Sequence, residues 1–244
     1  MFVYASALIF MESGGTSIMH DVAIIGCGVI GAAAAFELSK YKLDIVILEK
    51  ENDVAMGASR ANSAIIHAGY DPKPGTLMAR LNVEGNRMAG ELCKALNVPF
   101  NRVGSLVLAF SDAEMLTVWE LYDRGVANGV PGLEVLMADQ VRKMEPEVSD
   151  QVVGALYAPS AGIISPWDYA LAFAETAVVN GAKLCLNTRV TGIEKRDGGY
   201  HIKTNRGEYD AQYIVNAAGV ESGLVHEMVA EKTFTIMPNR GEYT

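Results

Sequence analysis

The sequence predicts an α/β fold in which a mostly parallel sheet packs against helices. Two apolar runs, 21–25 and 44–48, have the length and β-branched composition of buried parallel strands, and the alanine-rich run 32–38 between them favours a helix. Strand, helix and strand in this order predict a βαβ unit. Half of the 244 residues are hydrophobic and a fifth are charged, so the chain can bury a substantial core, as one large domain or two small ones.

The remainder of the chain continues this alternation. Apolar residues from Leu77 to Leu96 lie mostly on one helical face. Ser165 is a plausible N-cap with Pro166 at the first helical position, and Asp197-Gly198-Gly199 has the composition of a hairpin turn. The predicted helices are 73–97, 113–128, 138–144 and 168–180, and the predicted strands are 104–110, 152–157, 183–195, 200–204 and 209–216.

The turn between the first strand and helix fits G-x-G-x-x-G, as Gly26-Cys27-Gly28-Val29-Ile30-Gly31. Gly26 permits the turn, Gly28 lets a pyrophosphate approach the backbone, and Gly31 lets helix and strand pack closely. The N–H groups and positive dipole end of the helix attract phosphates. With a strand before it and a helix after it, the motif predicts dinucleotide binding.

Glu49 follows the second strand, eighteen positions after Gly31. A carboxylate at this place accepts hydrogen bonds from an adenosine ribose and repels a 2′-phosphate, so NADP is disfavoured. We expect Glu49→Arg to weaken cofactor retention while leaving the fold intact. The adjacent Lys50 is included among the expected cofactor contacts.

Composition excludes several other classes of function. The net charge of −9 gives no general attraction for nucleic acid or anionic membranes. The three cysteines are odd in number and widely separated, which indicates neither a disulfide framework nor a metal site and favours the cytoplasm. The apolar run 2–11 is too short to span a bilayer and has no basic residue before it, so we expect 1–18 to be a disordered extension, with weak membrane association as the alternative.

The segment 50–75, about 25 residues without a clear hydrophobic period, distinguishes a flavin-binding chain from a simple nicotinamide-binding one. A nicotinamide-binding unit usually continues at once with another helix and strand, whereas long irregular segments in compact domains are functional or disordered. This one is too apolar for a linker, so we expect it to be ordered against a ligand. Ser59, Asn62 and Ser63 are candidate hydrogen-bonding partners of a pyrophosphate or flavin, and the alternative is that they cap the loop.

The glycine motif, Glu49, the stretch 57–70 and Arg240-Gly241-Glu242-Tyr243 together resemble the FAD-dependent oxidoreductases of the D-amino-acid oxidase and glycerol-3-phosphate dehydrogenase superfamily. Within it, the pattern from Asn62 to Gly69 is most similar to anaerobic-type glycerol-3-phosphate dehydrogenases and L-2-hydroxyglutarate oxidases. The resemblance implies FAD as the cofactor and a Rossmann-like FAD-binding domain joined to an α+β substrate domain. About half of a full-length member would follow Thr244, so we expect a C-terminally truncated chain with an incomplete substrate domain.

The resemblance also implies how the chain is divided. The turn Ala217-Ala218-Gly219 would return beneath the dinucleotide, and Ala218, Gly219 and Val190 are its expected contacts. The FAD-binding domain would comprise 19–100 and 166–230. The substrate-side domain would comprise 101–165 and 231–244.

The implied activity is oxidation of a small anionic secondary alcohol to a ketone with transfer of hydride to the flavin. We expect sn-glycerol 3-phosphate as substrate and dihydroxyacetone phosphate as product. The alternative substrate is L-2-hydroxyglutarate, and the alternative of another class is an FAD-binding module without activity of its own. Oxygen, a quinone or an electron-accepting partner subunit could each reoxidise the flavin.

Two residues are candidates for catalysis. The neutral imidazole of His67 could accept the hydroxyl proton near neutral pH, although a packed histidine or a covalent flavin attachment is also compatible with the segment. Arg240 could clamp a phosphate or carboxylate through its planar guanidinium, and a surface ion pair is the alternative.

Overall fold

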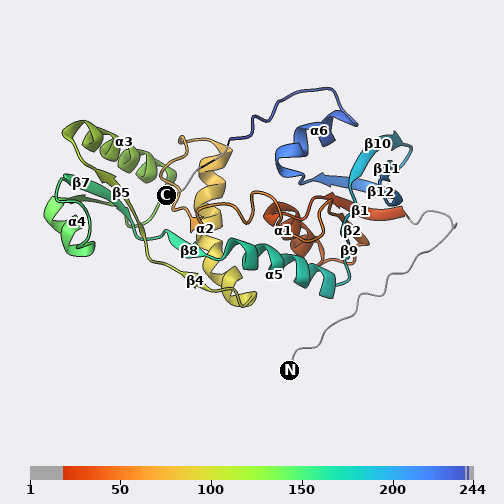
Figure 1. Cartoon of the computed structure of the whole chain (residues 1–244), viewed down its shortest axis with the longest axis horizontal. Coiled ribbons are helices and arrows are strands. Elements are labelled where there is room, and N and C mark those ends of the chain that lie inside the picture. Colours follow the sequence, from red (N-terminus) through yellow and green to blue (C-terminus); the bar gives the residue numbers. More distant parts are fainter. Residues whose placement is uncertain (1–18, 240, 242–244) are drawn as a thin grey trace.

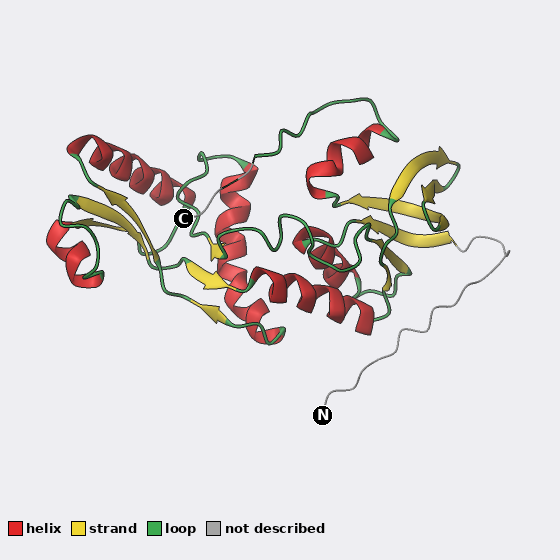
Figure 2. Cartoon of the chain, in the orientation of Figure 1, coloured by secondary structure: helices red, strands yellow, loops and turns green. Residues whose placement is uncertain are grey.

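The computed structural model describes residues 19–239 and 241, and it has two sheets at opposite ends of an elongated molecule. A six-stranded sheet forms one end and a three-stranded sheet forms the other, with helices α2 (Leu77–Ala95) and α5 (Pro166–Val179) between them (Figure 1). Figure 2 shows the long loops that join these layers. The predicted α/β class with a mostly parallel principal sheet is confirmed.

The six-stranded sheet has the order β10-β11-β12-β1-β2-β9. Strands β12, β1, β2 and β9 run parallel, and β10 and β11 add an antiparallel meander at one edge. The first strand therefore pairs with the last, with Ile25 opposite Asn216. The bounds are β1 Met19–Ile25, β2 Ile45–Leu48, β9 Lys183–Cys185, β10 Val190–Arg196, β11 Gly199–Thr204 and β12 Gly207–Asn216.

Both faces of this sheet are covered, which explains why β1 and β2 read as nearly continuous apolar runs. On one face, α1 (Val29–Leu38) and α5 pack over Ile24 and Ile47. On the other face, Ala23 and Leu48 belong to a cluster that includes Val225 of α6 (Ser222–Glu227), which follows the short 3-10 helix η1 (Gly219–Glu221). Strands from 19–48 and 183–216 thus contribute side chains to both clusters.

The second sheet is antiparallel and has the order β5-β7-β6. Helix α3 (Asp112–Asn128) covers one face through Val118, and α4 (Ala138–Met144) covers the other through Val141. The strands are β5 Ser105–Ala109, β6 Glu134–Met137 and β7 Gly154–Ala158. The division into domains at the expected limits stays a prediction.

A small third sheet links the two ends. It consists of β3 (Ile65–Ile66), β8 (Gly162–Ile164) and β4 (Phe100–Asn101), with β8 in the middle. The predicted cap of α5 is confirmed, because Ser165 Oγ accepts a hydrogen bond from the Asp168 N–H at 3.3 Å.

The single strand predicted at 183–195 is wrong. The segment forms β9 and β10, which lie at opposite edges of the sheet. Asn187 has a positive φ of 53°, and its N–H donates to the Glu51 carbonyl at 2.7 Å while the Thr188 N–H donates to the Glu49 carbonyl at 2.7 Å. These bonds carry the chain across the end of β2 instead of along it.

The predicted apolar face of the helix near 77–96 is also partly wrong. Leu77 and Leu81 are 61% and 52% exposed, and the side chains that α2 buries are small or polar: Ala79, Asn86, Ala89 and Cys93. The helix begins later than predicted, at Leu77, because Thr76 caps it. No helix within the described residues has the length and apolar character that a bilayer span requires. The expected extension 1–18 lies outside the described residues.

Candidate cofactor site

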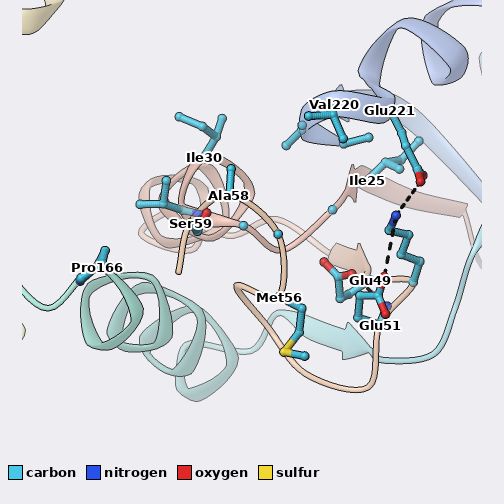
Figure 3. Close-up of a pocket in the computed structure, with 18 of the residues that line it drawn as sticks. Ile25, Ile30, Glu49, Glu51, Met56, Ala58, Ser59, Pro166, Val220 and Glu221 are labelled. Atoms are coloured by element: carbon cyan, nitrogen blue, oxygen red, sulfur yellow. Dashed lines mark hydrogen bonds and ion pairs between the residues drawn. The ribbon is translucent and has the colours of Figure 1, made fainter. Parts of the chain in front are cut away.

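A cavity of about 690 Å³ opens at the carboxyl ends of β1 and β2. Its walls come from the turn after β1, the end of β2, the loop 56–66, the crossing segment 188–190 and the turn after β12. In open α/β sheets, ligands bind outside the carboxyl ends of the strands, and this volume lies in the range of cofactor sites. Figure 3 shows the cavity between the start of α1 and the end of β2.

The glycine turn brings three backbones into contact at one wall of the cavity. Gly26 has φ +96°, and a Cβ at this position would lie 2.6 Å from the Ala217 carbonyl oxygen. A Cβ on Gly31 would overlap the Gly26 carbonyl oxygen. Only glycine therefore permits the turn, the start of α1 and the segment after β12 to meet.

The first turn of α1 faces the cavity, with Gly28 as its N-cap residue. The Val29 N–H donates a hydrogen bond to Ser59 Oγ at 2.8 Å, so the loop 56–66 is anchored on the helix start (Figure 3). The first turn of α1 contains no acidic side chain. The positive end of the helix dipole is thus presented to the cavity without a protein carboxylate in that turn.

Glu49 is 6% exposed and uses both carboxylate oxygens on backbone N–H groups. Oε2 accepts from Cys27 at 2.6 Å, and Oε1 accepts from Glu51 at 2.9 Å. Each oxygen retains a lone pair, which a ligand hydroxyl can use. Burial, followed by the negative charges of Glu49 and Asp53, raises the pKa of the Cys27 thiol to about 12, so this cysteine stays neutral.

An ion-paired cluster closes the wall beside Glu49. Lys50 Nζ donates to Glu221 Oε1 at 2.6 Å, and Arg189 Nη1 lies 3.2 Å from Glu221 Oε2. The hydrogen bond from Lys50, together with the charges of both cations, lowers the pKa of the Glu221 carboxyl. The cluster joins the end of β2 to η1, and one of the dashed lines in Figure 3 ends at the labelled carboxylate of Glu221.

The loop 57–66 is ordered largely by Asn62. Its Nδ2 donates to the Ala58 and Ser59 carbonyls at 3.1 and 2.9 Å, and its Oδ1 accepts from the Ala64 N–H at 2.8 Å. Asn62 thus caps the loop, and it also lines the cavity. Ala64 lies in the left-handed region at φ 62°, just before β3 turns away along the wall.

The cavity brings together most of the residues expected from the sequence: Gly26, Gly28, Val29, Ile30, Glu49, Lys50, Ser59, Asn62, Val190, Ala218 and Gly219. Three others do not line it. Gly31 lies beneath the turn, whereas Ser63 and His67 are exposed, His67 directly after the lining residue Ile66. Arg240 lies outside the described residues.

Nothing in the local sequence marks several other residues as part of the cavity wall. Pro166 and Tyr169 come from α5, whose end reaches the cavity only through tertiary packing. Arg189 directly precedes the expected residue Val190, and Glu221 lies two positions after Gly219, but the pairing of Arg189 with Glu221 depends on the crossing segment. Tyr70 does not line the cavity; it is partly buried and packs against the position of Gly125 in α3.

A sequence profile described as FAD dependent oxidoreductase (DAO) matches residues 21–244, almost the whole chain. The chain belongs to this FAD-dependent oxidoreductase family. Its cofactor is therefore FAD, as predicted. The cavity fits this cofactor. A glycine turn that an added Cβ would fill lies where a dinucleotide places its pyrophosphate, and the buried carboxylate of Glu49 lies where it places its ribose.

Two proteins of similar sequence are longer than this chain. A glycerol 3-phosphate dehydrogenase of Caloramator mitchellensis is 54% identical over 225 residues, covering 92% of this chain and 47% of that protein. An L-2-hydroxyglutarate dehydrogenase of Escherichia coli K12 is 34% identical over 229 residues, covering 92% and 54%. The chain thus spans about half the length of these relatives.

Solved structures agree with the fold. The L-α-glycerophosphate oxidase of Mycoplasma pneumoniae, reduced by dithionite and with FAD bound, superposes with a TM-score of 0.82 at 32% identity and covers 87% of this chain and 57% of that one. Glycine oxidase from Geobacillus kaustophilus gives 0.81 at 28% identity, covering 87% and 58%.

Proposed function

We propose that the chain binds FAD in this cavity and forms part of an enzyme that oxidises sn-glycerol 3-phosphate to dihydroxyacetone phosphate. The choice of substrate rests on the difference in sequence identity: the chain is 54% identical to a glycerol 3-phosphate dehydrogenase and 34% identical to an L-2-hydroxyglutarate dehydrogenase. Both relatives are named for anionic secondary alcohols, so the reaction class is common to the two candidates.

We assign the phosphate end of FAD to the start of α1. The backbone at Gly28, Val29 and Ile30 would receive the pyrophosphate, where the helix dipole favours negative charge. Gly31 acts beneath it by allowing the close packing of the turn. Ser59 Oγ, already fixed by the Val29 N–H, has its own proton available for a phosphate oxygen.

The adenosine end is assigned to the wall around Glu49. The free lone pairs of its carboxylate would accept the ribose hydroxyls, and Lys50 and Val190 would flank the base. Ala218 and Gly219 form the wall on the β12 side, where Gly219 has φ +57° and no atom within 4 Å of an added Cβ.

The flavin end is assigned to the loop that contains Asn62 and Ser63 and leads into His67. FAD, when bound, supplies the hydride acceptor. His67, exposed and directly beyond the cavity wall, would take the hydroxyl proton of the substrate on its neutral imidazole. Arg240, in the undescribed end of the chain, stays the proposed anion clamp.

A second candidate function is oxidation of L-2-hydroxyglutarate, which the 34% identical relative supports. The two substrates differ in the anion to be clamped, a phosphate against a second carboxylate. The remaining alternative is an FAD-binding module without activity on its own.

The visible spectrum of the purified chain tests these proposals. We expect a flavin absorption band that bleaches without oxygen when sn-glycerol 3-phosphate is added, and more slowly with L-2-hydroxyglutarate. Faster bleaching with L-2-hydroxyglutarate would reverse the order of the candidates. A flavin band that neither substrate bleaches would support the module, and a folded chain that cannot be loaded with FAD would refute the assignment of the cavity.

The partners of the enzyme follow from the same reaction. Reoxidation of the bleached flavin by air, by a soluble quinone or only by an added protein fraction identifies oxygen, a quinone or an acceptor subunit, respectively, as the electron acceptor.

We place the protein in the cytoplasm, in line with its three free cysteines, and the expectation of weak membrane association concerns residues 1–18. Sedimentation with anionic vesicles measures that association directly.

A further inference from the structure

The backbone of residues 67–72, here called the clamped loop, is held by side chains of the two neighbouring helices. Asn86 of α2 binds the first carbonyl of the loop, and Asn128 and Arg124 of α3 bind later ones. The bonds are Asn86 Nδ2 to His67 O at 3.0 Å, Asn128 Nδ2 to Gly69 O at 2.9 Å and to Pro72 O at 2.8 Å, and Arg124 Nη1 to Asp71 O at 2.9 Å. A loop without regular structure thus has a fixed backbone.

Asn86 is the most constrained of these donors. It is 6% exposed, and its Nδ2 donates to the Ser160 carbonyl at 2.9 Å as well as to His67. Its Oδ1 accepts from Arg102 Nη1 at 3.0 Å. Rotating the amide by half a turn would face Oδ1 with two carbonyl oxygens and the NH₂ group with a guanidinium, so the network permits one orientation only.

Arg102 braces this orientation from the far side. Its Nη2 donates to the Asn86 carbonyl at 2.9 Å, and its Nη1 also donates to the Ser160 carbonyl. The planar guanidinium therefore holds both ends of the Asn86 residue, its amide and its main chain. A lysine at this place would keep the charge but lose the fork.

The network acts at the point where the loop leaves the cavity wall. Ile66 lines the cavity and pairs with Gly162 in the third sheet, which fixes the backbone before His67. Asn86 fixes the peptide plane after His67, and Ala68 is 1% exposed. With both flanks held, the direction in which the His67 side chain leaves the backbone is set.

We propose that Asn86, braced by Arg102, is a positioning residue that fixes the backbone at His67, and with it the direction in which the imidazole leaves the chain beside the wall of the cofactor cavity. The inference rests on the proposed role of His67 as proton acceptor. Its structural part, control of the imidazole by Asn86, is measurable without turnover.

The first test is NMR of the histidine rings in the FAD-loaded chain. The sequence contains four histidines, so His67→Ala assigns the His67 ring signals by their loss, and the other three serve as internal references. We expect Asn86→Ala to shift, broaden or double the His67 signals alone. Arg102→Lys should change the same signals to a smaller extent, and it carries the test if Asn86→Ala does not fold.

Asn128→Ala is the matched control. Like Asn86, Asn128 donates two hydrogen bonds through its Nδ2, but both go to the clamped loop, at Gly69 and Pro72, and neither goes to His67. The His67 signals should stay at their wild-type positions in this variant. Unchanged His67 signals in folded Asn86→Ala, or in Arg102→Lys where Asn86→Ala does not fold, would overturn the proposal. So would an equal change in Asn128→Ala.

The second test is a double-mutant cycle on flavin reduction by sn-glycerol 3-phosphate. Asn86→Ala should slow reduction at saturating substrate by roughly tenfold to a hundredfold, with little change in KM. In a His67→Ala background the same substitution should have no further effect, and an additive loss would refute action through His67. If His67→Ala itself reduces flavin at the wild-type rate, the proposed proton role fails, and the NMR test still decides the positioning.

Discussion

Replacing Glu49 by glutamine would separate the structural role of this carboxylate from its role toward the cofactor. In the structure it accepts two backbone N–H groups, from Cys27 at 2.6 Å and Glu51 at 2.9 Å, at 6% exposure. Hydrogen bonds to charged groups contribute about 1.5–3 kcal/mol each, and a neutral one about 0.5–1.5 kcal/mol. The expectation that Glu49→Arg leaves the fold intact does not hold for a buried carboxylate with these partners.

In Glu49→Gln, one oxygen remains as a neutral acceptor, and the other N–H group faces an amide NH₂. Losing about 1 kcal/mol at the first bond and about 1–3 kcal/mol at the second gives a loss of about 2–4 kcal/mol in the free energy of unfolding. This is a large share of the roughly 5–15 kcal/mol that a folded chain has. Urea unfolding of the FAD-free chain, followed by far-UV circular dichroism, measures it as a lower midpoint at constant slope.

Glu51→Gln is the control for charge and side-chain shape. Glu51 has a side chain 45% exposed and only a 3.7 Å ion pair with Lys50, so its replacement should cost about 0.5 kcal/mol or less. If Glu49→Gln and Glu51→Gln unfold at the same urea concentration, the carboxylate of Glu49 does not hold the glycine turn, and the reasoning is refuted.

Three further substitutions or measurements probe the same region. Gly31→Ala should abolish FAD retention, because the new Cβ overlaps the Gly26 carbonyl oxygen, whereas Gly57→Ala, with no atom within 4 Å of its Cβ, should retain FAD; equal retention would contradict the packing argument. Ser59→Ala removes the side-chain acceptor at the first residue of α1 and should lower the free energy of unfolding by about 1 kcal/mol, and an unchanged urea midpoint would argue against the anchor. Cys27, whose pKa is raised from 9.0 to about 12 by burial, should resist iodoacetamide at pH 9 until the chain unfolds. Because the unfolded chain releases this proton first, stability should fall as the pH rises from 9.0 toward about 12, and rapid labelling of the folded chain would disprove the burial.

The sequence predicted those parts of the site that depend on local pattern. The turn after β1 and Glu49 were found because their spacing is set by one βαβ unit, and Ser59 and Asn62 because the glycine-punctuated loop that follows it is too apolar for a linker. Asn62 fulfils the loop-capping alternative and also lines the cavity. Local pattern did not predict that His67 lies just beyond the wall of the cavity and is not one of its lining residues.

The remaining features depend on contacts between distant segments. Strands β3, β4 and β8 contain two or three residues each, too few for a period to be recognised. The division of 183–195 into two strands depends on backbone bonds to the carbonyls of Glu49 and Glu51, which no local propensity reports. Likewise, Asn86 reads as one more polar position on a helix, and only the fold shows that it is buried against His67.

The pairing of β1 with β12 has a consequence for synthesis of the protein. Ile25 finds its neighbour on one side only when Asn216 has left the ribosome, so the nucleotide-binding turn cannot be completed early. Until then, one edge of an apolar strand stays open to other nascent chains, and non-local pairing of this kind is slow. Chaperones that shield the amino-terminal strand during translation should therefore raise the yield of folded protein, and expressed fragments that end before residue 207 should aggregate.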